Sequence, residues 1–163
     1  MPASPASTIG DLLSRLRSIA PHLATAHDMR QCEALLTAID PALDPAALVD
    51  ARLVLAAFLL ESRDGHRGDN VARAFGVYRQ LLGATHPDTL TEVWQAVVNG
   101  MANCLIADPD AQPEAFEAVS GLLDRLAGQL RGGDPERLAV ALGTHAQLLQ
   151  SARTGDRDEN QRL

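Results

Sequence analysis

The chain has 163 residues and carries a net charge of −7; 46% of its residues are hydrophobic but only 3% are aromatic. This length suffices for one compact domain or a short repeat array with a buried core. The acidic balance argues against nucleic acid or an anionic membrane as the main partner. An apolar content dominated by Ala and Leu favours helices over sheets.

Seven helices are predicted from apolar residues that recur at helical spacing between start and stop signals. Residues 1–7 precede them and are predicted to be disordered. The predicted helices span about 8–25 (with a break near Pro21), 28–39, 45–63, 69–83, 89–107, 113–131 and 135–152. No segment shows strand alternation, so the fold class is predicted to be all-α. The helical domain covers 8–153, and residues 154–163 are either a frayed tail or the start of a further repeat.

Capping signals mark the ends of these helices. Asp44-Pro45 and Asp134-Pro135 each place a carboxylate before a proline at the first helical position. Other signals are the capping-box spacing Thr89-x-x-Glu92, a start at Asp110 and Pro113, and a stop at Gly132-Gly133.

One phrase occurs twice along the chain. Residues 59–70 read LLESRDGHRGDN and residues 148–160 read LLQSARTGDRDEN. The copies lie two units apart if the chain repeats every ~45 residues, a length typical of helical-pair repeats. Each copy is predicted to form a turn, in which Gly65 or Gly155 breaks one helix and Asp69 or Asp158 caps the next.

Apolar sets also recur at about this interval. Leu48, Leu55-Ala56 and Leu59 correspond to Trp94, Met101-Ala102 and Leu105, and Ala74-Phe75 and Tyr78 correspond to Ala118-Val119 and Leu122. The small residue in each set is predicted to allow a close crossing of helix backbones.

These features resemble a known repeat family. GHRGDNVARAFGVYRQLL and TGDRDENQ resemble the GDRxEN turn of bacterial tetratricopeptide (TPR) repeats, which are often linked to CHAT-type domains. ATHPDTLTEVW is similar to the HPDTL segment of kinesin-light-chain-like TPRs. The likeness covers roughly residues 45–160, and weakly 8–40. It implies a short α-solenoid of about three to four TPR-like hairpins that serves as a protein–protein interaction or scaffold module.

Motifs for catalysis or metal binding are absent from the sequence. None of the five histidines forms an HExxH or a His/Cys cluster, and no GxSxG, P-loop or GxGxxG is present. Cys32 and Cys104 are expected to be buried free thiols. Cys104 with His145 could be a nucleophile and a base, but no orienting partner is evident. We therefore expect no catalytic residue, metal or cofactor; the alternative is a small all-helical enzyme or ligand-binding protein whose pocket is assembled only in three dimensions.

The resemblance places the first helix of each pair on the concave face, where polar residues contact a partner. The residues predicted to bind a protein or peptide are Arg52, Asn99, Asn103 and His145. Asn99 and Asn103 are four apart, so they project from one helix face.

The helix at 135–152 is predicted to expose an apolar face made of Leu138, Leu142, Ala146 and Leu149. Such a face usually marks an interface. It predicts either a homodimer through the C-terminal helices or contact with repeats beyond Leu163. A cytoplasmic protein is expected, because neither a signal peptide nor a membrane-spanning apolar run is present.

Overall fold

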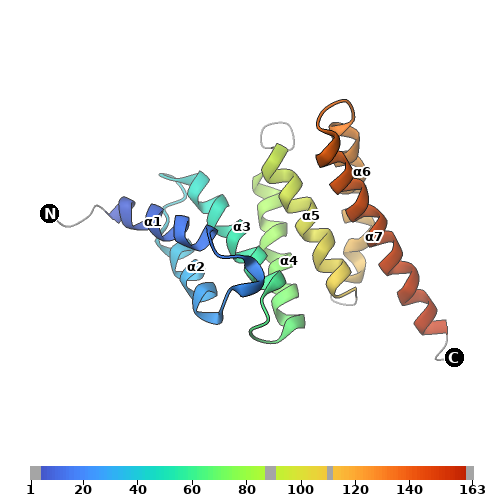
Figure 1. Cartoon of the computed structure of the whole chain (residues 1–163), viewed down its shortest axis with the longest axis horizontal. Coiled ribbons are helices and arrows are strands. Elements are labelled where there is room, and N and C mark those ends of the chain that lie inside the picture. The colour runs from blue at the N-terminus through green and yellow to red at the C-terminus, as the bar shows by residue number, and fades with distance from the viewer. Residues whose placement is uncertain (1–4, 87–90, 110–111, 161–163) are drawn as a thin grey trace. The chain divides into compact units, whose positions relative to one another are not determined.

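The computed structural model describes the chain at residues 5–86, 91–109 and 112–160, and its side chains at 8–86, 92–109 and 112–152. The chain divides into two compact units, Met1–Leu81 and Leu82–Leu163. Every regular element in the described ranges is helical (Figure 1). The prediction of an all-α fold is thus confirmed. No helix among the described residues is long and apolar enough to cross a bilayer.

The first unit contains four α-helices and one short 3-10 helix. They are α1 (Pro5–Arg17), η1 (Pro21–Leu23), α2 (Ala26–Ala38), α3 (Pro45–Glu61) and α4 (Arg67–Ala84), whose last turn passes the boundary of the unit. α2 packs against α3, and α1 packs against both. The break predicted near Pro21 is confirmed, although α1 already ends at Arg17. Side chains from all four helices fill the core, among them Leu16, Cys32, Leu55, Phe58 and Leu81.

Local capping sets where α2 and α3 begin. Asp44 Oδ1 accepts a hydrogen bond of 2.9 Å from Ala47 N, and Pro45 is the first helical residue, as predicted. α2 begins at Ala26, two residues before the predicted start, because Thr25 and Asp28 form a capping box. Hydrogen bonds from the side chain and backbone N–H of Thr25 lower the pKa of the Asp28 carboxyl.

The first copy of the repeated phrase forms the turn between α3 and α4. Gly65 has a φ of +85°, a left-handed conformation that glycine adopts without steric cost. The buried Asn70 side chain closes the turn by donating a 2.7 Å hydrogen bond to Asp64 O. Ser62 Oγ donates to Ala24 O across 2.8 Å, and Asp64 Oδ2 accepts from Ala26 N, so the turn also fastens the start of α2.

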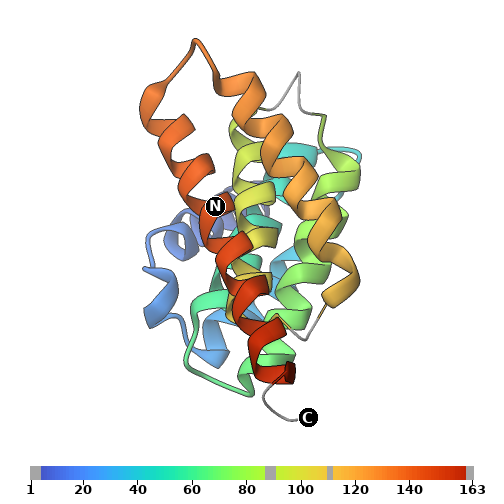
Figure 2. The same ribbon diagram turned by 90° about the vertical axis from the view of Figure 1, so that its right-hand side faces the viewer.

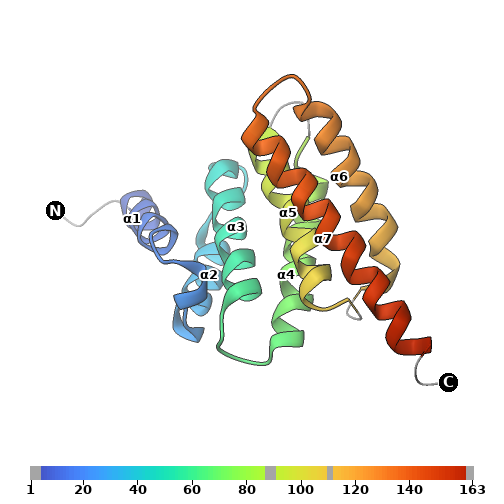
Figure 3. The same ribbon diagram turned by 45° about the vertical axis from the view of Figure 1, so that its right-hand side comes forward.

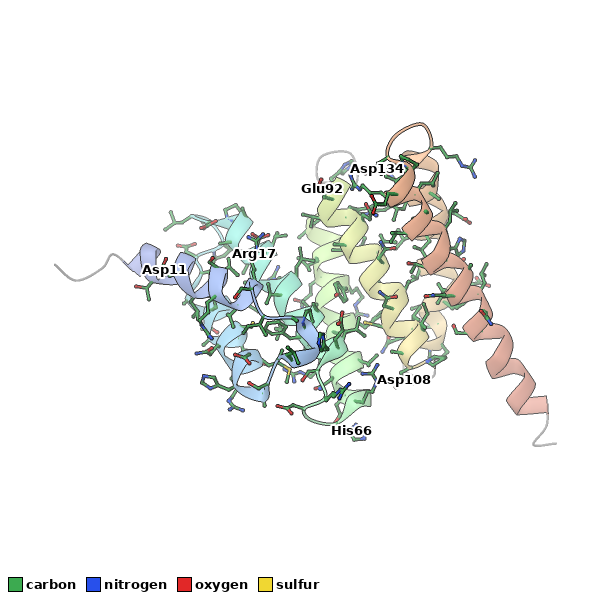
Figure 4. All side chains as sticks on the ribbon, in the orientation of Figure 1. Asp11, Arg17, His66, Glu92, Asp108 and Asp134 are labelled. Carbon is green, nitrogen blue, oxygen red and sulfur yellow. The ribbon has the colours of Figure 1, made fainter. Side chains whose placement is uncertain are left out.

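The predicted cap of α4 at Asp69 is wrong. α4 begins at Arg67, and His66 precedes it, with its Nδ1 accepting a 3.4 Å hydrogen bond from Asp69 N. Asp69 therefore lies in the first turn, where a carboxylate still stabilises the positive end of the helix dipole. His66 is labelled at this turn in Figure 4.

The second unit is formed by three α-helices, each of which packs against the other two. They are α5 (Thr91–Ala107), α6 (Phe116–Leu130), preceded by the 3-10 helix η2 (Pro113–Ala115), and α7 (Pro135–Asn160). Glu92 and Asp134 mark the same end of the unit in Figure 4, so α5 and α7 run parallel. Figures 2 and 3 show α6 and α7 as antiparallel neighbours.

Several predicted helix ends in the second unit can be checked. Asp134 Oδ1 accepts hydrogen bonds from Glu136 N and Arg137 N, which confirms the predicted cap. The predicted stop is confirmed too, since α6 ends at Leu130 and Gly132 has a φ of +87°. The start predicted at Pro113 is occupied by η2, so α6 proper begins later. Thr89 and Asp110 lie outside the described residues.

The end predicted for α7 at residue 152 is wrong, because the helix continues to Asn160. Gly155 therefore breaks no helix and Asp158 caps none, so the second copy of the phrase does not repeat the turn of the first. The reason is that glycine within a helix costs only about 1 kcal/mol, and no proline follows to enforce a stop.

The recurring apolar sets are buried in most positions. Ala56 and Ala102 are both fully buried, as predicted for small residues at close helix crossings. Ala118 is exposed, so the correspondence predicted for Ala74 and Ala118 is wrong. The buried face of α6 instead contains Val119, Leu123, Leu126, Ala127 and Leu130.

Candidate functional site at the seam of α6 and α7

Three polar side chains meet where α6 packs against α7 in the second unit. Ser120 Oγ lies 2.7 Å from His145 Nε2. On the other side of the imidazole, His145 Nδ1 lies 3.3 Å from Asp124 Oδ1. Together they form a hydroxyl–imidazole–carboxylate array, which we call the seam array.

The direction of the hydrogen bond between Ser120 and His145 follows from the tautomer of the imidazole. A carboxylate can only accept, so Asp124 Oδ1, 3.3 Å from His145 Nδ1, favours the tautomer that carries its proton on Nδ1. In the neutral ring Nε2 is then an acceptor, and it takes the hydrogen bond of the Ser120 hydroxyl. In this tautomer the Ser120 proton is directed at a base.

Helix geometry explains why these residues meet. Ser120 and Asp124 are four residues apart on α6, so both project from the face that meets α7. His145 comes from the antiparallel α7, and only 14% of its side chain is exposed, whereas 75% of the Asp124 side chain is exposed. The array thus has a solvated acidic end and a half-buried serine end.

The seam array borders an exposed apolar face of α7. Leu142 and Leu149 lie three residues before and four residues after His145, and they are 48% and 42% exposed. Ala146 is exposed between them and Leu138 is half-buried. We call Leu138, Leu142, Ala146 and Leu149 the α7 stripe; three of its four residues are exposed, as the sequence predicts.

The rim of α6 next to the α7 stripe is small and acidic. Glu117 and Asp124 are both exposed there, one turn on either side of Ser120 and Gly121. Gly121 is exposed, and a methyl group built there would meet no other side chain within 4 Å beyond its chain neighbours.

The predicted partner-binding residues lie in different surroundings. Asn103 is exposed on α5, and Asn99, one turn earlier, is half-buried. Asn99 Oδ1 is buried and has no hydrogen-bond partner within the described part of the chain. His145 belongs to the seam array. Arg52 lies half-buried on α3 in the first unit.

A second polar group connects α5 and α7. Arg137 Nε donates a 2.6 Å hydrogen bond to Gln95 Oε1, and Arg137 Nη1 lies 3.9 Å from Glu92 Oε1. On the same helix α5, Trp94 is buried, and the Arg125 guanidinium lies 5.9 Å from its ring centre. These contacts stabilise the packing of α5 against α6 and α7.

The two cysteines are buried and free, as predicted. Burial raises the pKa of the Cys32 thiol to about 11 and that of the Cys104 thiol to about 12. Because the thiolate is the nucleophilic form, Cys104 is a poor nucleophile, and the pairing of Cys104 with His145 has no support. No group of three or more His, Cys, Asp or Glu side chains able to hold a metal ion occurs among the described residues.

Sequence reasoning missed Ser120 and Asp124. Their spacing on a predicted helix was the available signal, but it identifies a site only after α7 has placed His145 against them. Comparison with known proteins gives no further guide: no family model, no curated protein and no solved structure matches this chain.

Proposed function

We propose that this protein is a non-catalytic interaction module, which binds a helical segment of a partner protein along the α7 stripe. The observation that carries the proposal is the exposure of Leu142 and Leu149, seven residues apart on one helix face. Large apolar side chains at this spacing match the i, i+3, i+4 and i+7 positions of a helix laid against them. Because each leucine is already about half buried, covering the rest of it contributes roughly half of the 1.5–3 kcal/mol gained by burying a fully exposed leucine.

The charge around the α7 stripe indicates the chemistry of the partner. Asp124 and Glu117 form its α6 rim, and the whole chain has a net charge of −7. Arg137, near the start of α7, is already bound to Gln95. A partner helix with Arg or Lys beside its apolar face is therefore complementary, and opposite charges speed and orient association.

We further propose that the helices form TPR-like hairpins of a short α-solenoid, as the sequence resemblance implies. The parallel course of α5 and α7, with α6 antiparallel to α7, supports this arrangement within the second unit. In such an array Asn99 and Asn103 contact a bound peptide. The exposure of Asn103 and the half-burial of Asn99, one turn earlier on the same face of α5, support that role. Arg52 is a proposed contact of the first unit.

A synthetic peptide tests the proposed partner chemistry. The probe is a helical 20-residue peptide with leucines on one face and arginines on both flanks; its twin has glutamates in place of the arginines. Fluorescence anisotropy should show the basic peptide binding more tightly than the acidic twin. Leu142→Asp should weaken binding about tenfold or more, since it removes the apolar contact of one leucine and sets a carboxylate against the apolar face of the peptide.

Leu43→Asp is the matched control, because Leu43 is an 84% exposed leucine of the first unit. This variant should bind like the unmodified chain. Equal binding of the two peptides, or equal loss in the two variants, would contradict the proposal. Sedimentation of the protein without peptide tests whether a second copy of the chain covers the α7 stripe. A concentration-dependent dimer that Leu142→Asp abolishes would assign the stripe to that second copy.

A further inference from the structure

We propose that Ser120 is an acyl-acceptor site, at which the serine hydroxyl takes an acyl group from an activated ester. This inference is carried by the seam array and would stand without a partner on the α7 stripe, although Leu142 and Asp124 belong to both surfaces. Ser120 Oγ, His145 Nε2 and Asp124 Oδ1 stand in the order nucleophile, base and orienting carboxylate, at separations of 2.7 and 3.3 Å. A serine is a weak nucleophile unless an adjacent base removes its proton, and this arrangement supplies the base.

The transfer has a simple balance of atoms. Ser120 Oγ attacks the carbonyl carbon of the ester while its proton passes to His145 Nε2. The bond between the carbonyl carbon and the leaving oxygen then breaks, and the leaving alcohol departs as its anion. The imidazolium returns its proton to the solvent or to this anion. The products are an ester on Ser120 and the free alcohol, with the imidazole again neutral.

The helix that holds Ser120 sets a limit on the reaction. The backbone N–H groups of Ser120 and Gly121 lie within α6, where they bond to carbonyls one turn earlier. They cannot donate to the negative oxygen that develops on the substrate, and such a donor is worth about 100- to 1,000-fold in rate. The reaction is therefore confined to esters with good leaving groups. It stops at the acylated serine, because release of the acyl group by water needs the same stabilisation.

Space and surroundings admit a small acyl group. Ser120 is half-buried, and the next residue, Gly121, is exposed and adds no side chain beside it. Leu142 flanks the imidazole on the α7 side and offers apolar contact to the acyl chain. The Asp124 carboxylate, 3.3 Å from His145 Nδ1, favours the tautomer that leaves Nε2 available as the base.

The composition of the chain leaves few other side chains that would compete with Ser120 for an activated ester. The sequence contains no lysine, the side chain that activated esters otherwise modify most readily, and the two cysteines are buried with raised pKa values of about 11 and 12. The full chain is incubated with p-nitrophenyl acetate, nitrophenolate release is followed by absorbance, and the acetyl group is located by peptide mass spectrometry. The expected result is about one equivalent of rapid release, with the acetyl group on Ser120.

Variants separate activation from mere accessibility. Ser120→Ala should abolish the rapid phase, and His145→Gln should slow it about 100-fold or more, the usual contribution of a positioned base. Asp124→Asn should slow it as well; Asp124 is exposed, so this variant keeps the fold even if His145→Gln does not. Ser18→Ala is the control, because Ser18 is an exposed serine whose hydroxyl bonds to the backbone of Arg15.

Acetylation spread over several serines would overturn the proposal, as would an unchanged rate in either His145→Gln or Asp124→Asn. A further variant answers the case in which Ser120 reacts too slowly to measure. Ser120→Cys should react with iodoacetamide at least about tenfold faster than Ser18→Cys, because an imidazole neighbour promotes the thiolate. Equal alkylation rates of the two introduced cysteines would also refute activation by His145.

Discussion

Replacing Asn70 tests the reasoning about the turn between α3 and α4. Asn70 is buried, and its Nδ2 donates a 2.7 Å hydrogen bond to Asp64 O beside Gly65. Asn70→Ala removes the donor and leaves the carbonyl with no protein partner in a partly buried position. Such a loss costs about 1–3 kcal/mol, and the lower half of that range applies because Asp64 itself is exposed. Asn70→Asp should cost more, since it sets a negative carboxylate against the same carbonyl oxygen.

Urea unfolding followed by far-UV circular dichroism measures both costs. For a unit of this length, each 1 kcal/mol also lowers the melting temperature by about 4–8 °C. Asp69→Ala is the matched control, because 80% of the Asp69 side chain is exposed in the same turn. The expected order of stability is the unmodified chain, then Asp69→Ala with a loss of about 0.3–1 kcal/mol from the helix dipole, then Asn70→Ala, then Asn70→Asp. If Asn70→Asp were as stable as the unmodified chain, or if Asp69→Ala cost as much as Asn70→Ala, the role assigned to the Asn70 amide would be refuted.

Three further predictions concern single polar groups. Asn99→Leu should raise the free energy of unfolding by about 1 kcal/mol, because it removes a buried acceptor without a partner. Urea unfolding followed by Trp94 fluorescence compares this variant with the control Asn103→Leu. A loss of stability in Asn99→Leu would show that Asn99 Oδ1 has a hydrogen-bond partner. Both cysteines should react slowly with an aromatic disulfide reagent in the native protein at about pH 8. Cys104 should react more slowly than Cys32, since their pKa values are raised to about 12 and 11. A native thiol that reacts as fast as the same thiol in the unfolded protein would contradict their burial. Because the pKa of Asp28 is lowered in the folded protein, the stabilisation by its carboxylate is present at neutral pH and is lost as pH falls through that lowered value, below 3.8. Asp28→Asn should therefore lower the urea midpoint at about pH 7 and make little difference at about pH 2. An equal effect at both pH values would show that Asp28 acts through packing.

Local signals predicted most of the fold. The starts of α3 and α7 followed from Asp44-Pro45 and Asp134-Pro135, because a cap and a proline act within one turn of the chain. The start of α2 was misplaced because its box uses Asp28 where a glutamate is more usual. The end of α7 differs from the prediction because glycine does not stop a helix unless the backbone needs a positive φ, and α7 continues through Gly155.

The candidate site was less predictable, for a physical reason. The α7 stripe follows from helical periodicity, so the sequence alone identifies it. The seam array depends on the register between α6 and α7, and packing of the whole unit decides that register. A serine and an aspartate four residues apart are common on helices; only the position of His145 between them distinguishes this pair.

The proposed interaction is tested most directly by photo-cross-linking from within the α7 stripe in the cells that naturally produce the protein. A photoreactive phenylalanine analogue replaces Leu142 or Leu149 in turn, and Leu43 in the control. The account predicts that both α7 positions, but not position 43, cross-link to the same protein, and that the attached peptide is an amphipathic helical segment rich in Arg or Lys. Cross-links of equal yield from position 43, or attachment from α7 only to a second copy of this chain, would contradict it.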